Sequence, residues 1–274
     1  VGYSYHWLTP PDSVYGIDFN NIDGVRLDYS TYSGDWEYGA QFTVGRVQAD
    51  TFISGTPAEL ELENVVAVSF EATRDWFSAR TLFARATTTA VNEDFDTFVA
   101  GMGQFGAFIP SATAAAEGFS VNEDSGTFFE IAIDIDKYDW FIGAEFTKTE
   151  VDDAIIASDE AWYVTAGMRF GKFTPHITYE VEEADNGDQV ALVAGLPSMI
   201  DTGDAVTDAT WSAIYQAATG IAADQAQDTS AVTLGLRYDV EPGFAVKAGV
   251  TWYSDDLIDV NDATLLRVGA NYTF

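Results

Sequence analysis

The stretch Ala263-Thr264-Leu265-Leu266-Arg267-Val268-Gly269-Ala270-Asn271-Tyr272-Thr273-Phe274 decides the fold that this chain is expected to adopt. Every second residue from Leu266 to Phe274 is apolar, and the residues between them are polar or small. Successive side chains of a β-strand point to opposite faces, so this alternation predicts a strand with one apolar face. About ten residues is also the length that a tilted strand needs to cross a lipid bilayer.

The same alternation recurs along the chain and predicts eleven strands. Short turns alternate with long polar connections, and Asp-Trp stands at the entrance of three strands, at residues 35–36, 75–76 and 139–140. Membrane barrels have short turns at one end, long loops at the other and girdles of aromatic residues. The strands are expected at roughly 23–33, 35–48, 62–74, 75–87, 126–137, 138–150, 159–171, 172–182, 229–239, 243–254 and 263–274, and the long extracellular loops include 88–124 and 183–228.

These features favour an all-β fold: a transmembrane antiparallel up-and-down β-barrel that forms one domain over residues 1–274. A soluble sandwich also alternates, but its strands usually have about five to six residues and its apolar faces meet in a dry core. Bacterial single-chain barrels have even strand numbers, so either residues 1–8 supply a twelfth strand or an N-terminal block is absent. Arg46 and Arg85 fall on the apolar face near the outer rim, which requires a bulge or snorkelling side chains.

The composition limits the classes of protein and partner. The chain has no apolar run of about 18 residues, which excludes a spanning helix, and no cysteine, which excludes thiolate catalysis and Cys-ligated metals. Neither an initiator Met nor a signal sequence opens it, so a processed or N-terminally incomplete chain is expected. The 44 acidic and 12 basic residues give a formal net charge of −32, which argues against nucleic acid as a partner. The acids either form a solvated surface, or hold divalent cations and favour cation passage.

Two segments carry a family resemblance. The strand Leu265 to Phe274 is similar to the closing strand of Gram-negative outer-membrane porins, and this similarity implies that Tyr272 and Phe274 are read by the barrel assembly machinery. The opening Val1-Gly2-Tyr3-Ser4-Tyr5-His6-Trp7-Leu8-Thr9-Pro10-Pro11 resembles a porin segment that leads into a loop narrowing the pore. The resemblance implies four or five strands before Val1, sixteen in all, and a homotrimer in the outer membrane in contact with lipid and lipopolysaccharide.

The alternation also predicts which charged side chains line the lumen. Facing rows of acidic and basic side chains would set a transverse field that orients solutes and determines ion preference. The alternative is that these charges pair between neighbouring strands and keep the wall rigid. The predicted pore-lining residues are Arg26, Asp28, Glu71, Arg80, Glu130, Asp134, Glu145, Arg169, His176, Glu180, Arg237, Lys247 and Arg267.

Residues 1–22 are predicted to form either a constriction loop inside the barrel or a loop on its rim. Prolines stiffen such a loop, and its aromatic rings offer stacking surface to sugars or aromatic solutes. The residues predicted for the constriction are Tyr3, Tyr5, His6, Trp7, Pro10, Pro11 and Tyr15. The Phe-, Ala- and Gly-rich stretch 98–119 is expected to pack inside the barrel or against a neighbouring subunit, and a short helix is predicted around 209–222.

Chemistry is not indicated. Only His6 and His176 could act as the histidine base that activates a nucleophile, and no G-x-S-x-G motif or metal-ligand spacing accompanies them. Clustered acids in the loops suit loosely bound Ca²⁺ or Mg²⁺, yet no complete calcium loop is present. We therefore expect no cofactor and no enzyme, but an outer-membrane porin for passive diffusion of small hydrophilic solutes. Two alternatives stay open: a porin that prefers one substrate, and a structural or adhesive barrel acting through acidic extracellular loops.

Overall fold

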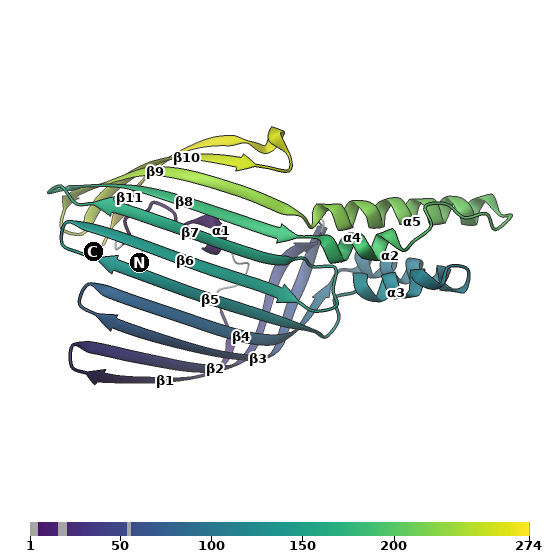
Figure 1. The fold of residues 1–274 in the computed structure, drawn as a ribbon, viewed down its shortest axis with the longest axis horizontal. Coiled ribbons are helices and arrows are strands. Elements are labelled where there is room, and N and C mark those ends of the chain that lie inside the picture. The colour runs from purple at the N-terminus through teal and green to yellow at the C-terminus, as the bar shows by residue number, and fades with distance from the viewer. Residues whose placement is uncertain (1–4, 16–20, 54–55, 274) are drawn as a thin grey trace.

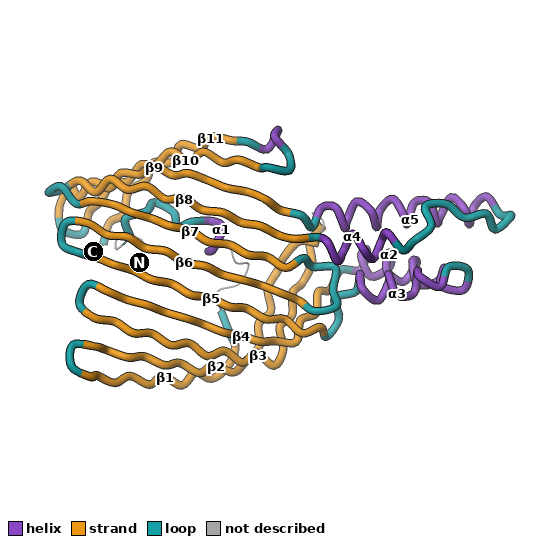
Figure 2. The backbone as a smooth tube through the Cα atoms, in the orientation of Figure 1, coloured by secondary structure: helices purple, strands orange, loops and turns teal. Residues whose placement is uncertain are grey.

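The computed structural model describes residues 5–15, 21–53 and 56–273. Eleven antiparallel strands follow one another in chain order in a single curved sheet, as Figures 1 and 2 show, which confirms the predicted fold class and strand number. Among the described residues β1 and β11 are the edges of the sheet. The strands are β1 (Asp23–Ser33), β2 (Trp36–Ile53), β3 (Thr56–Arg74), β4 (Phe77–Val91), β5 (Asp124–Asp136), β6 (Trp140–Val151), β7 (Ser158–Met168), β8 (Phe173–Asp185), β9 (Gln227–Glu241), β10 (Phe244–Asp255) and β11 (Ala263–Tyr272).

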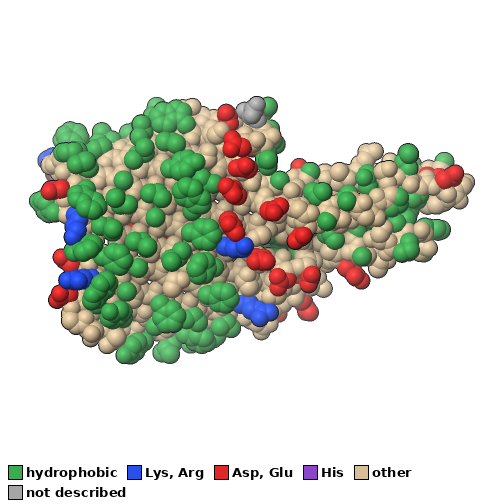
Figure 3. Space-filling model, viewed as in Figure 1, with side chains coloured by type: hydrophobic (Ala, Val, Ile, Leu, Met, Phe, Trp, Pro, Cys, Tyr) green, Lys and Arg blue, Asp and Glu red, His purple; other side chains and the backbone are tan. Residues whose placement is uncertain are grey.

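The outer face of the sheet is an apolar belt. The register aligns one row of apolar side chains across five strands: Leu27, Phe42, Val68, Phe83 and Phe129. Leu27 is 67% exposed and Phe83 51% exposed, and Figure 3 shows the belt as a broad green surface. Proteins that live in water rarely expose an apolar surface of this extent, so the belt is the surface that faces lipid.

A bulge in β3 ends the belt on the side of the long connections. Asn64 has a φ of +53° and is the extra residue around which the pairing shifts with both β2 and β4. Beyond it the outer face of the two strands is polar, and Gln48 there donates a hydrogen bond to Glu61. The bulge expected near Arg46 and Arg85 is therefore present, while the predicted bounds 35–48 and 62–74 were too short because the hairpin extends past the belt.

Two of the long connections, from β4 to β5 and from β8 to β9, together form a helical module. It consists of α2 (Glu93–Gln104), η1 (Phe105–Ala107), α3 (Pro110–Phe119), α4 (Gly187–Ala194) and α5 (Ala205–Asp224). Figure 1 shows it projecting beyond the strand ends. Its shared core includes Met102, Phe119 and Trp211, each 0% exposed. The Phe-rich stretch therefore packs against α5 and not inside the barrel, while the alternative that it packs against a neighbouring subunit stays a prediction.

Local capping explains where two of these helices begin. The side chain of Asn92 accepts a hydrogen bond from the Phe95 backbone N–H at 2.9 Å, and Asp204 does the same for Thr207 at 3.0 Å. The helix predicted at 209–222 therefore starts earlier, at the residue after Asp204. Two short helices, α1 (Asp12–Tyr15) and η2 (Asp259–Asn261), lie elsewhere. None of the helices in the described ranges is long and apolar enough to cross a membrane.

Candidate functional site: a segment clasped on the concave face

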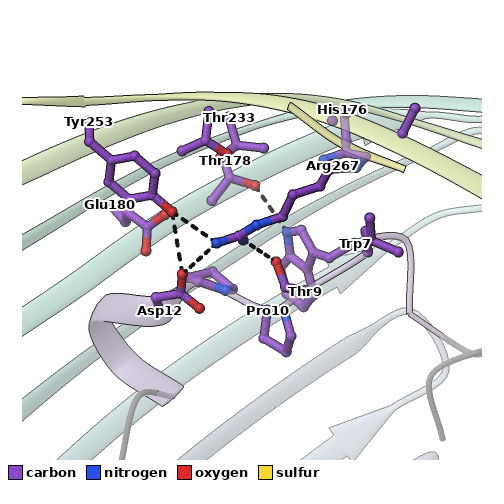
Figure 4. Close-up of a pocket in the computed structure, with 16 residues that line it drawn as sticks. Trp7, Thr9, Pro10, Asp12, His176, Thr178, Glu180, Thr233, Tyr253 and Arg267 are labelled. Atoms are coloured by element: carbon purple, nitrogen blue, oxygen red, sulfur yellow. Dashed lines mark hydrogen bonds and ion pairs between the residues drawn. The ribbon is translucent and has the colours of Figure 1, made fainter. Parts of the chain in front are cut away.

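Residues 5–15, here called the inner segment, lie on the concave side of the sheet and end in α1 (Figure 1). They contact side chains from β6 to β11, far away in sequence. Figure 4 shows part of this contact, in which Trp7, Thr9 and Asp12 of the segment lie across strands carrying Thr178, Glu180 and Arg267. The segment therefore occupies space that a barrel lumen would otherwise leave to water.

Basic side chains hold the first half of the inner segment. Arg237 on β9 donates from Nη1 to the carbonyl oxygen of Tyr5 at 2.8 Å, and Lys247 on β10 donates from Nζ to the carbonyl oxygen of Trp7 at 2.8 Å. Arg267 on β11 donates to Thr9 Oγ1 at 2.6 Å and reaches Asp12 at 3.2 Å. Lys247 is 1% exposed, so the segment covers this ammonium group almost completely.

The middle of the inner segment is held by rings and hydroxyl groups. The Trp7 indole N–H donates to Thr178 Oγ1 at 3.0 Å, while the His6 ring lies 4.3 Å from the Phe141 ring and 4.8 Å from the His176 ring. Gly235 makes room for His176, because a Cβ atom there would lie 2.1 Å from its Nε2. Burial lowers the pKa of His6 to about 2, aided by the nearby His176 and Lys247, so this ring is neutral at physiological pH.

Carboxylates hold the second half. Ser13 donates to Glu180 Oε2 from its backbone N–H at 3.2 Å and from its hydroxyl at 3.1 Å. The Tyr15 hydroxyl donates to Glu145, and the Tyr163 hydroxyl donates to the same carboxylate at 3.2 Å. Glu145 and Glu180 are 5% and 6% exposed. The segment thus lies between a basic wall on β9 to β11 and an acidic wall on β6 and β8.

The structure brings together part of the predicted set. The register places twelve of the thirteen predicted pore-lining residues on the face opposite the apolar belt, and Arg169 directly follows the last residue of β7. The role of all thirteen in lining a pore stays a prediction. Arg80 lies 2.5 Å from Glu130 and 3.4 Å from Glu145, next to the second half of the segment. Arg169 pairs with Asp136 near the short turns and lies 5.1 Å from the centre of the Phe141 ring, which contacts His6. Away from the inner segment lie Arg26 and Asp28, which pair with each other on β1, and Glu71 on β3.

Some of the residues predicted for the constriction also contact the concave face, and others do not. Tyr5, His6, Trp7 and Tyr15 make the contacts described above, and Pro11 is buried, its carbonyl oxygen accepting a hydrogen bond from the Tyr15 backbone N–H at 3.2 Å. Pro10 is exposed. Tyr3 and Phe274 lie outside the described residues, and the ring of Tyr272 lies 6.1 Å from that of Phe244.

Sequence reasoning missed several contact residues. Asp12, Ser13, Thr165 and Thr178 are ordinary polar residues in the sequence, and only the fold shows that they meet; Thr165 and Thr178 hydroxyls are 2.8 Å apart on adjacent strands. A signal was available, because both threonines fall on the polar face of their strands. Within the described ranges, no group of three or more His, Asp or Glu side chains is arranged to hold a metal ion.

Comparisons with solved structures identify the fold. The OmpF porin of Salmonella typhi, solved in complex with daunomycin, is 12% identical, with 90% of this chain matching 61% of that one at a TM-score of 0.51. An anion-selective porin from Comamonas acidovorans is 10% identical; the match covers 91% of this chain and 59% of that porin, with a TM-score of 0.48. No protein-family model and no curated protein sequence matches. The chain spans about three fifths of the length of these two porins.

An apolar outer belt, a polar concave face and a segment laid across that face together define the class: the chain has the fold of the outer-membrane porins. The level of identity shows the fold, and the resemblance inferred from the closing strand is thereby confirmed at that level.

Proposed function

We propose that this protein is a porin of a bacterial outer membrane, through which small hydrophilic solutes and ions diffuse passively. The observation that carries the proposal is the inner segment, which is fixed by charged side chains on the polar face of a sheet whose other face suits lipid. In a channel, a loop held inside the lumen sets the smallest radius, and the charges around it set ion preference. No chemical step or cofactor is part of this proposal.

The same proposal includes the setting of the channel. The long connections and the helical module face the outside of the cell, and the closing strand with Tyr272 and Phe274 is recognised during barrel assembly. A homotrimer in contact with lipid and lipopolysaccharide is the expected assembly, with loosely bound Ca²⁺ or Mg²⁺ at the acidic loops. The resemblance in sequence and the acidic loops support these points.

Single-channel recording in planar bilayers tests the proposal. The purified protein should give stable conductance steps, and reversal potentials under a KCl gradient should report ion preference. An Arg267→Gln variant should change the step size, because Arg267 holds Thr9 and Asp12. A correctly folded, heat-modifiable protein that gives no conductance would refute diffusion. The helical module would then favour the second candidate function, a structural or adhesive barrel.

A further inference from the structure

The charges of the chain are segregated along the axis of the sheet. The five segments at the end with the long connections hold 28 of the 44 acidic residues and none of the 12 basic ones; they are 47–64, 86–125, 149–160, 182–230 and 254–263. Arg46, Arg85 and Lys148 directly adjoin three of these segments, and Lys148 pairs with Glu160 at 2.9 Å. The short turns at the opposite end carry both signs, with Asp35 near Arg74 at 3.4 Å as an example. Figure 3 shows a mainly acidic row of side chains, with basic ones among them, along the edge of the apolar belt nearest the helical module.

The topology places these five segments together. In an antiparallel sheet whose strands follow chain order, every second connection lies at the same end, so all five surround one mouth. The helical module belongs to this mouth and contributes acids but no bases, from Glu93 and Asp94 at the start of α2 to Asp224 at the end of α5. Asp159 and Glu182 continue the acidic surface on the concave face towards Glu180.

The inner segment gives a second, independent observation. The basic residues of β9 to β11 would offset the acidic mouth if they faced the solute path. Instead Lys247 is covered by the backbone of Trp7, Arg237 donates to Tyr5 and also pairs with Asp239 at 2.7 Å, and Arg267 pairs with Asp12. The segment therefore covers or neutralises the wall that would favour anions, while most of the acids at the mouth with described burial are exposed.

We propose that the channel selects cationic solutes, and that this selectivity arises at the mouth with the long connections rather than at the basic wall of the constriction. The inference rests on the proposed function. A mouth lined by one sign of charge raises the local concentration of oppositely charged solutes and their rate of entry. The effect is screened by salt, because the Debye length falls from about 30 Å at 0.01 M to about 3 Å at 1 M.

A pair of matched fourfold variants tests where the selectivity arises. The mouth variant combines Glu93→Gln, Asp94→Asn, Asp152→Asn and Asp153→Asn, all at exposed positions in the connections. The control variant combines Asp35→Asn, Asp75→Asn, Asp139→Asn and Glu241→Gln, which are exposed at the short turns and change the net charge by the same amount. Asn suits both Asp75 and Asp153, whose φ angles of +40° and +57° it tolerates.

Reversal potentials under KCl gradients at low and high ionic strength give the readout. In 10 mM KCl we expect the mouth variant to lower the cation-to-anion permeability ratio about twofold or more, and in 1 M KCl to leave it unchanged. The control variant should keep the ratio of the original protein. Equal effects of both variants, or no effect of the mouth variant at low salt, would overturn the inference.

The covered basic wall is tested separately with Lys247→Met. Because the inner segment covers Lys247, its removal should leave the permeability ratio within about twofold of the original, even where conductance changes. A strong rise in cation preference would show that Lys247 faces the solute path and would overturn this part of the argument. Absence of any conductance in the original protein would instead refute the proposed function itself, so the two failures are distinguishable.

Discussion

The inner segment and the helical module are both excursions from the same sheet, yet different forces hold them in place. The inner segment is fastened by hydrogen bonds and charges, such as Lys247 to Trp7 and Ser13 to Glu180. The helical module is fastened by an apolar core around Met102 and Trp211. The concave face of a porin is polar, so it offers donors and acceptors but little apolar surface to bury against. The position of the inner segment should therefore depend on pH and on single charges, whereas the module should not.

The largest expected effect comes from a substitution that destabilises the helical module and leaves the contacts of the inner segment unchanged. Trp211 is 0% exposed, its ring lies 5.1 Å from that of Phe105, and its indole N–H donates to the Pro197 carbonyl at 2.8 Å. Trp211→Ala should cost about 3–5 kcal/mol of module stability through the cavity it leaves. Limited proteolysis should then cut the module while single-channel conductance persists. Thr210→Ala, at an exposed neighbour, is the control, and loss of conductance in Trp211→Ala alone would show that the two regions are coupled.

The next largest effect comes from a substitution that removes a hydrogen bond of the inner segment and leaves the helical module unchanged. Lys247→Met removes the donor to the Trp7 carbonyl and should cost about 1–3 kcal/mol, because that partly buried oxygen then lacks this partner. The inner segment should loosen, and single-channel conductance should rise and become noisier. The matched control is Lys172→Met, since Lys172 donates to the Val240 carbonyl at 2.6 Å in a short turn, away from the inner segment. Similar changes in both variants would contradict a specific role for Lys247.

A smaller effect sharpens the comparison through pH. The pKa of His6 is lowered from its ordinary value of 6.5 to about 2 in the clasped state, so protonation favours release of the inner segment. Clasping is unaffected above about pH 6.5 and weakens as pH falls below it, by about 1–2 kcal/mol at pH 5. His176, Lys247, Arg169 and Arg237 are the charged or titratable groups near this ring, and none supplies a negative charge.

Conductance recorded at pH 7.5 and pH 5 checks this effect. The original protein should show larger and noisier steps at pH 5, whereas His6→Phe, which keeps a ring against Phe141, should show a much weaker pH dependence. Proteolysis of the helical module should be the same at both pH values. A pH response that survives in His6→Phe would assign it to other groups.

The smallest effect concerns one end of one helix. Asn92 is 6% exposed and caps α2, and its side-chain amide also donates to the Pro57 carbonyl at 2.9 Å. Asn92→Ala should cost about 1 kcal/mol, visible as faster hydrogen exchange in the first turn of α2. Asn92→Ser retains a capping oxygen and should recover most of the protection. Unchanged exchange in Asn92→Ala would show that the shared core alone fixes this helix.

The sequence by itself determined the strands, their number and their two faces. Alternation with a period of two is a local property, so Leu266 and Val268 could be assigned to the outer face and Arg267 to the inner face without knowledge of any partner. At Arg46 the same pattern predicted a bulge or a snorkelling side chain, and the structure has a bulge in β3 where it pairs with this part of β2. The lengths of β2 and β3 did not follow, since their outer halves lie beyond the belt, where the alternation continues but the polar side chains take the outer face.

Only the tertiary structure decided where the helical module and the inner segment make their contacts. The stretches around Phe105 and Trp211 are more than a hundred residues apart, and their shared core exists because β4 to β9 bring the two connections to one end of the sheet. Likewise, the contact between Arg237 and Tyr5 joins residues 232 positions apart, and it depends on the curvature of the sheet. The alternation along the chain predicts which face of the sheet each side chain takes. It does not predict how far that side chain lies from side chains on distant strands across a lumen.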